Sequence, residues 1–173
     1  MAGLRALAEG PLVWVSYAFG TVASMVGTAV VAGLLLAKRQ SRAAIYVVLV
    51  ILGTILVTSL LKLMVDLPRP VVEDQVLQYA SSAMPSGHAS NIAAAATAAC
   101  VLSAIYLRTR ARRRLVLLVG VLMALVVGLD RLMLGVHTLT EVAAGYALGV
   151  GVGLLTAYLV DPSPRRIAVI LKE

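Results

Sequence analysis

Five apolar runs, each long enough to cross a bilayer, constrain this chain more than any other feature. They lie at about Leu12–Ala37, Ala43–Val65, Ala89–Leu107, Leu115–Leu134 and Leu139–Val160, with few or no charges in their middles. A helix of about 20 apolar residues spans the hydrocarbon core of a membrane. No soluble domain of 173 residues can bury a composition that is 61% hydrophobic and only 13% charged. The sequence therefore predicts an all-α, polytopic transmembrane bundle of about five spans.

The spans leave little chain outside the membrane, which predicts a single integral membrane domain over residues 1–173. Residues 1–11 are mixed in polarity, and we expect a short interfacial segment there rather than a cleavable signal peptide. The connection 66–85 is long for so compact a protein. Apolar residues within Val72–Tyr79 follow helical spacing, which fits either a short amphipathic helix on the membrane surface or a loose polar loop.

The basic residues are distributed unevenly between the two predicted sides of the membrane. The side with the 38–42 turn, the 108–114 turn and the tail after Val160 carries eleven of the 15 lysines and arginines. The positive-inside rule therefore places these turns in the cytoplasm and puts segments 66–88 and 130–138 together on the outer face. This predicts a multi-pass protein of the plasma (inner) membrane with an outward or periplasmic site. A nucleic-acid partner is not expected, because the arginines lie in short turns between spans.

Small residues in the last predicted span indicate close helix packing. Gly145, Gly149 and Gly153 repeat at four-residue spacing, which lets another helix backbone approach closely. We interpret them as contacts within one chain, and a seam between two copies in a homo-oligomer is the alternative. The single cysteine, Cys100, lies in an apolar run and offers neither a disulfide nor a metal cluster.

The segment Pro85-Ser86-Gly87-His88 opens the third predicted span. Proline and serine suit the start of a helix, and glycine lets the backbone approach a ligand. The N–H groups of a first helical turn, with the positive end of the helix dipole, attract anions. His88 adds a group that exchanges protons near neutral pH. The segment is therefore either an anion cradle or an N-capped membrane helix with an incidental histidine.

Two basic residues lie at and just beyond the end of the second span, on the outer predicted side of the membrane. Lys62 ends that span and Arg69-Pro70 follows seven residues later. That spacing returns to one helix face, although Pro68 is expected to end the helix first. Taken alone, the pair also fits a lysine that reaches from a helix end and an interfacial arginine.

A third polar cluster, residues 130–141, joins the fourth and fifth spans. Gly135 is expected to break the helix ahead of His137, and ionisable residues at such depth usually serve a purpose. Glu141 lies four residues after His137, where its carboxylate can accept the ring N–H and make the other nitrogen a better nucleophile. Thr138-Leu-Thr-Glu141 also fits a capping box for the last helix, which is a purely structural alternative.

The three clusters, in this order and all at the outer ends of predicted spans, resemble the type 2 phosphatidic acid phosphatase superfamily. Its membrane branch dephosphorylates lipid phosphates and diphosphates without a metal or other cofactor. The resemblance covers about Lys62 to Val160, the expected catalytic core. It implies that His137 attacks phosphorus, that Glu141 orients it, and that His88 protonates the departing oxygen. The implied phosphate-binding residues are Lys62, Arg69, Ser86, Gly87 and Arg131.

Three features depart from the family pattern. Asp130 stands where a serine usually precedes the arginine, and an anion there repels phosphate unless it pairs with Arg131 or turns away. The acid after His137 is a glutamate rather than the shorter aspartate. Members of this branch commonly have six spans, whereas the sequence shows five. These departures leave the reaction class intact and bear on the substrate.

The expected activity is hydrolysis of a membrane lipid phosphate or diphosphate at the outer face. Outward orientation favours a polyprenyl diphosphate of the undecaprenyl or decaprenyl type, a carrier recycled in cell-wall synthesis. Phosphatidylglycerophosphate and phosphatidate are the alternative substrates. Two other classes also fit the clusters: a non-catalytic lipid-phosphate binder and a transporter. Continuous spans argue against the transporter, because substrate paths usually contain interrupted helices.

Overall fold

The computed structural model describes residues 2–68 and 81–164, which form six helices. Their bounds are α1 (Ala2–Ala18), α2 (Thr21–Ala37), α3 (Ser41–Val65), α4 (Gly87–Tyr106), α5 (Arg110–Met133) and α6 (Leu139–Val160). Helices α3 to α6 are each long and apolar enough to cross a membrane. The bent pair Gly10–Ala18 and Thr21–Ala37 makes a fifth candidate span. The prediction of an all-α, multi-pass membrane bundle is confirmed.

The first predicted span, Leu12–Ala37, is not one continuous helix. The chain leaves the helix after Ala18, and the two halves meet at a 47° bend. Gly20 stands at the break with extended backbone angles, φ −71° and ψ 174°. The short interfacial segment expected over residues 1–11 is helical in its described part and lies mostly ahead of the candidate span, which begins at Gly10. Its place at the membrane interface stays a prediction. A hydropathy pattern does not register such a bend, because Phe19 and Gly20 leave the run apolar.

The predicted turn over residues 108–114 is shorter than expected. Arg110 to Arg114 form the beginning of α5, where the Thr109 side chain accepts a hydrogen bond from the Arg112 backbone N–H at 3.4 Å. The charged side chains therefore extend the fourth span rather than interrupt it. The turn predicted over residues 38–42 is also shorter than expected, because α2 ends at Ala37 and α3 begins at Ser41. The possible surface helix within Val72–Tyr79 lies outside the described residues.

Helices α4 and α6 pack closely along the glycine face of α6. A methyl group on Gly149 would lie 2.2 Å from the Ser90 carbonyl oxygen, and one on Gly145 would lie 2.6 Å from the Ser86 carbonyl oxygen. Only a residue without a side chain permits this approach. The interpretation of these glycines as contacts within one chain is confirmed. Their spacing brings the start of α6 against the first turn of α4.

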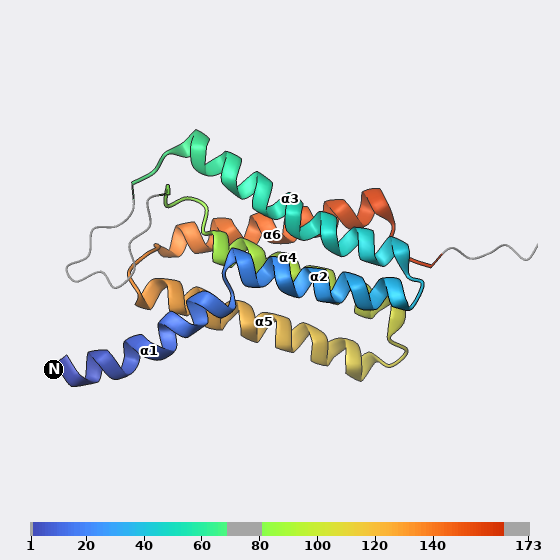
Figure 1. The fold of residues 1–173 in the computed structure, drawn as a ribbon, viewed down its shortest axis with the longest axis horizontal. Helices are drawn as coiled ribbons and strands as arrows, with labels where there is room; N and C mark the ends of the chain where they lie inside the picture. The colour runs from blue at the N-terminus through green and yellow to red at the C-terminus, as the bar shows by residue number, and fades with distance from the viewer. Residues whose placement is uncertain (1, 69–80, 165–173) are drawn as a thin grey trace, which may run out of the picture.

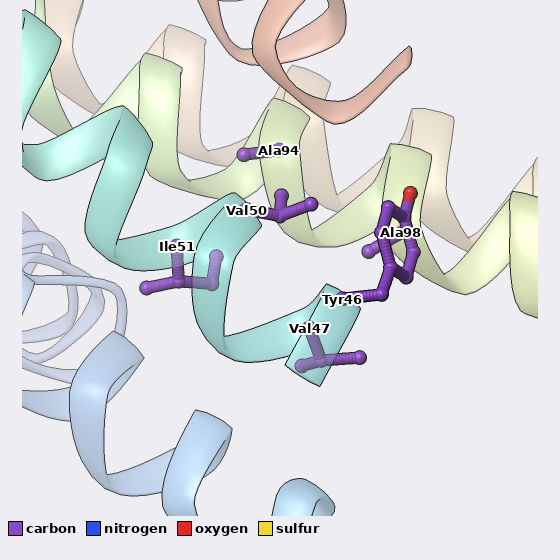
Figure 2. Close-up of a cluster of buried hydrophobic side chains, with 6 residues drawn as sticks. All are labelled: Tyr46, Val47, Val50, Ile51, Ala94 and Ala98. Carbon is purple, nitrogen blue, oxygen red and sulfur yellow. The ribbon is translucent and has the colours of Figure 1, made fainter. Parts of the chain in front are cut away.

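A small hydrophobic core joins α3 to α4 in the half of the bundle nearer the α2–α3 turn. Figure 2 shows Val50 and Tyr46 of α3 extending to Ala94 and Ala98 of α4. The Tyr46 hydroxyl also donates to the Gly153 carbonyl oxygen of α6 at 3.2 Å. This bond satisfies the polar end of a fully buried aromatic side chain. The core therefore holds α3, α4 and α6 together from the inside.

One end of the bundle collects the elements that carry the three sequence clusters. The end of α3, the start of α4, the end of α5, the start of α6 and the α1–α2 break lie at the left of Figure 1. The α2–α3 and α4–α5 turns lie at the opposite end. The topology therefore gathers residues far apart in the sequence into one region.

Candidate active site

The connection between α5 and α6 holds His137 in a buried position. The chain breaks at Gly135, as predicted, with a φ of 65° that favours glycine. His137 follows two residues later and is 6% exposed. Its Nδ1 lies 2.7 Å from Oε2 of Glu141, which is 2% exposed. A carboxylate on Nδ1 fixes the proton there and leaves the lone pair of the neutral ring on Nε2.

Glu141 makes the contacts required by both of the roles that the sequence left as alternatives. Its Oε2 accepts the Thr138 backbone N–H at 3.2 Å, and the Thr138 hydroxyl accepts the Glu141 N–H at 3.4 Å, which completes a capping box. The same oxygen contacts the imidazole of His137. The capping box and the orienting contact are therefore one arrangement rather than two rival ones.

Ser86 precedes the first residue of α4, but its side chain does not cap the helix as the residue type predicted. It is the N-cap residue, yet its side chain makes no capping bond. The hydroxyl is fully buried and has no hydrogen-bond partner among the residues that the structure describes. The Ser86 backbone N–H instead donates to the Glu141 carbonyl oxygen at 3.1 Å. This bond attaches the first turn of α4 directly to the first turn of α6.

A second buried hydroxyl lies beside this turn. Thr58 of α3 also has a side-chain oxygen without a partner in the described part of the chain. Its methyl carbon lies 3.9 Å from the point where a Cβ on Gly87 would stand. Buried hydroxyl groups are usually hydrogen-bonded, so two such groups beside one helix N-terminus mark a site for a polar ligand.

Arg131 lies fully buried near the end of α5 and pairs with its neighbour Asp130. Its Nε donates to Asp130 Oδ2 at 2.9 Å, and its Nη2 contacts the same oxygen. The predicted conflict between Asp130 and a phosphate is thus settled by pairing. The second oxygen, Oδ1, has no partner within the described residues. Burying two charges requires such pairing, because an isolated charge is costly away from water.

The other imidazole contacts an element that the sequence clusters do not include. Nε2 of His88 lies 3.0 Å from the backbone oxygen of Ser16, in the last turn of α1. The Ser16 hydroxyl accepts a hydrogen bond from Arg131. Ser16 therefore contacts both His88 of the second cluster and Arg131 of the third.

Lys62 lies in the last turn of α3, which ends at Val65, three residues before Pro68. Its ammonium group donates to the Ser82 carbonyl oxygen, in the segment that leads to Ser86. The first cluster is therefore adjacent to the second. Arg69, the remaining predicted phosphate ligand, lies outside the described residues.

The contacts join all three clusters, and they add residues that sequence reasoning missed. Thr58 is four residues before Lys62 on the same face of α3, a spacing that could have drawn attention to it. Ser16 had no such signal beyond Gly20, a glycine within an apolar run.

An apolar cavity of about 330 Å³ lies between α2, α3 and α4. Phe19 at the helix break and Asn91, one turn into α4, line the end nearer the clusters. The rest of the lining includes Thr28, Ile51 and Ala98. A hydrocarbon chain is the kind of group that such a lining accepts.

The comparisons with known proteins agree with this fold. The family model of the PAP2 superfamily matches residues 43–165, which include all three clusters. A solved structure with a similar fold is the first transmembrane PAP2-type phosphatidylglycerolphosphate phosphatase from Bacillus subtilis. The TM-score is 0.79 at 20% identity, and the match covers 92% of this chain and 80% of that chain. A comparison with curated proteins finds no match.

Proposed function

Because the chain belongs to the PAP2 superfamily, we propose that it hydrolyses a lipid phosphate or diphosphate through a phosphohistidine, without a metal. Membership and fold make it an integral membrane lipid phosphatase. The observation that carries the proposed mechanism is the 2.7 Å contact between His137 Nδ1 and Glu141 Oε2. This contact directs Nε2, the nucleophilic nitrogen of a neutral imidazole, to attack.

In the first proposed step, His137 Nε2 forms a bond to phosphorus while the bond from phosphorus to the departing oxygen breaks. His88 gives a proton to that oxygen, and the lipid alcohol or lipid monophosphate leaves. In the second step, His88 takes a proton from water, which attacks the phosphohistidine. Inorganic phosphate is released and His137 is regenerated. His88 therefore loses one proton in the first step and regains one in the second.

Phosphoryl transfer needs positive groups around the equatorial oxygens more than it needs further covalent chemistry. Arg131, Lys62 and Arg69 are the proposed cations. The first turn of α4 at Gly87 adds backbone N–H groups and the positive end of a helix dipole. The hydroxyl of Ser86, which has no partner among the described residues, supports its role as a further donor.

A polyprenyl diphosphate is the first proposed substrate, with the site on the outer face of the plasma membrane. The charge distribution supports this orientation, because the α2–α3 turn and the arginine-rich start of α5 lie at the end of the bundle opposite the clusters. Phosphatidylglycerophosphate is the second candidate, because the similar fold in Bacillus subtilis belongs to a phosphatase named for that lipid. The apolar cavity supports a substrate with a hydrocarbon tail.

The test is release of inorganic phosphate by the purified full-length protein in detergent with EDTA. Polyprenyl diphosphate, phosphatidylglycerophosphate and phosphatidate are compared, with wild type measured beside His137→Ala. We expect the wild type to release phosphate and the variant to lose at least about 1000-fold in kcat, since the nucleophile is absent. Acid-labile label from a ³²P-lipid should remain on wild-type protein after rapid quenching.

The outcomes separate the proposal from its rivals. Full activity in His137→Ala would exclude this nucleophile, and inhibition by EDTA would exclude metal-free chemistry. Binding of lipid phosphates without any release would favour a non-catalytic binder. Helices α3 to α6 are uninterrupted, and the bend between α1 and α2 lies at the site end of the bundle. This arrangement differs from the broken helices at the midplane that are typical of transporters.

A further inference from the structure

The break between α1 and α2 releases one backbone carbonyl from its helix. In a continuous helix, the Ser16 oxygen would accept the N–H of residue 20. Here Gly20 N–H bonds to the Tyr17 oxygen at 3.4 Å instead. The Ser16 oxygen lies 3.0 Å from His88 Nε2. The bend thus presents a hydrogen-bond acceptor to the imidazole.

The Ser16 side chain makes a second contact with the site. Its hydroxyl donates to the Leu12 oxygen at 3.0 Å, so its lone pairs are available to accept. Arg131 donates to that hydroxyl, and Ser16 is only 5% exposed. A buried guanidinium held by a carboxylate on one side and a hydroxyl on another has little freedom to rotate.

We propose that Ser16 is a positioning residue that aims both His88 and Arg131 at the substrate phosphate. The inference rests on the proposed function for the roles of those two residues. It extends the site to the N-terminal helix, which precedes the residues 43–165 matched by the family model. A carbonyl oxygen can only accept, so the contact also assigns a proton to Nε2 of the neutral His88 ring.

The hydroxyl contact is tested with Ser16→Ala, Ser16→Thr and a matched control, Ser103→Ala. Ser103 is also a buried serine that bonds within its own helix, but it lies at the end of α4 away from the site. Ser16→Ala should raise KM about tenfold with a smaller change in kcat, because Arg131 loses a hydrogen bond that orients it. Ser16→Thr restores a hydroxyl and should recover most of the loss. Equal KM values for Ser16→Ala and Ser103→Ala would overturn this half of the proposal.

The carbonyl contact is tested at Gly20, because a side-chain substitution leaves the Ser16 backbone in place. A methyl group on Gly20 would lie 3.1 Å from the Ser16 oxygen and 3.6 Å from His88 Nε2. The approach to His88 Nε2 is an ordinary contact, whereas the approach to the Ser16 oxygen is tight, so the methyl group should shift that carbonyl. Gly20→Ala should therefore weaken the contact between the Ser16 oxygen and His88 and lower kcat about tenfold at unchanged KM. Gly33→Ala, in the following helix α2, is the control, since no described atom lies within 4 Å of a methyl group there. Matching kinetics for the two variants would contradict the role of the Ser16 carbonyl.

A measurement without substrate separates this inference from the proposed function. Nitrogen-15 NMR of histidine-labelled full-length protein in micelles reports which ring nitrogen of neutral His88 carries the proton, with His88→Gln used to assign the signals. We expect the proton on Nε2 in the wild type and an altered signal in Gly20→Ala. A proton on Nδ1 would refute the Ser16 contact even if the wild type hydrolyses lipids. A proton on Nε2 in a protein that hydrolyses none would support the contact and reject the proposed function.

Discussion

Glu141 is the residue where the structure adds most to the sequence. Its spacing from His137 allowed two separate roles, and one oxygen atom fulfils both. The family's aspartate is one methylene shorter than this glutamate. In this chain the carboxylate stands at the third position of a capping box and also contacts the imidazole.

Replacing Glu141 by glutamine should separate these two roles. Glutamine also serves in capping boxes, so the melting temperature should change little. The imidazole loses a charged partner that stabilises its cationic form, so kcat should fall on the order of 100-fold. Phosphate release and thermal unfolding in detergent measure the two effects.

Thr138→Ala is the matched variant for the cap. It removes the hydroxyl that accepts the Glu141 N–H and should cost about 1 kcal/mol of stability, with a smaller effect on kcat than Glu141→Gln has. If Glu141→Gln lost stability but kept its turnover, the carboxylate would be a cap alone.

Sequence reasoning could reach the site residues whose partners are near in the chain. The contact of His137 with Glu141 follows from a four-residue spacing, and Asp130 is adjacent to Arg131. Ser16 could not be found in this way, because its partners lie 72 and 115 residues further on. No local pattern marks a carbonyl that becomes available only when a helix bends.

At the scale of the elements, apolar length predicted the later helices well. The last predicted span, Leu139–Val160, has the bounds of α6, and the three spans before it differ only at their ends. Hydropathy reports how readily a segment enters lipid and not the direction of its helix axis. It therefore could not distinguish the bent pair α1 and α2 from one straight helix. It also placed Arg110 to Arg114 in a turn, because it does not register the cap at Thr109.

The close packing of α4 on α6 gives a prediction for one glycine of the last helix. In Gly149→Ala, the new methyl group would lie 2.2 Å from the Ser90 oxygen and 2.8 Å from the Ala94 nitrogen. The helices must separate to admit it, which should cost about 1–3 kcal/mol and lower the melting temperature in detergent.

Gly151→Ala is the control for this substitution. It lies two residues away in the same helix, and none of the atoms that the structure describes lies within 4 Å of the new methyl group. It should leave the melting temperature unchanged or raise it slightly, because alanine favours the helix. Equal melting temperatures for the two variants would contradict the packing described for α4 and α6.

For the molecule as a whole, the distribution of arginines predicts its orientation in the membrane. Ser41 lies at the start of α3, whereas Ser81 adjoins Ser82, which contacts Lys62 and Leu67 at the other end of that helix, near the clusters. Both are exposed. In a Cys100→Ala background, Ser81→Cys should react with a membrane-impermeant maleimide in intact cells. Ser41→Cys should react only after the membrane is opened. Labelling in the reverse order would place the site in the cytoplasm.

The double role of Glu141 also links catalysis to the least protected part of a helix. Helix ends fray far more readily than a bundle unfolds. We expect that opening of the first turn of α6 would take the carboxylate away from His137 while the other helices stay packed, because Glu141 is part of that turn. If His137 is the nucleophile that we propose, its orientation then depends on one turn of one helix rather than on unfolding of the whole bundle.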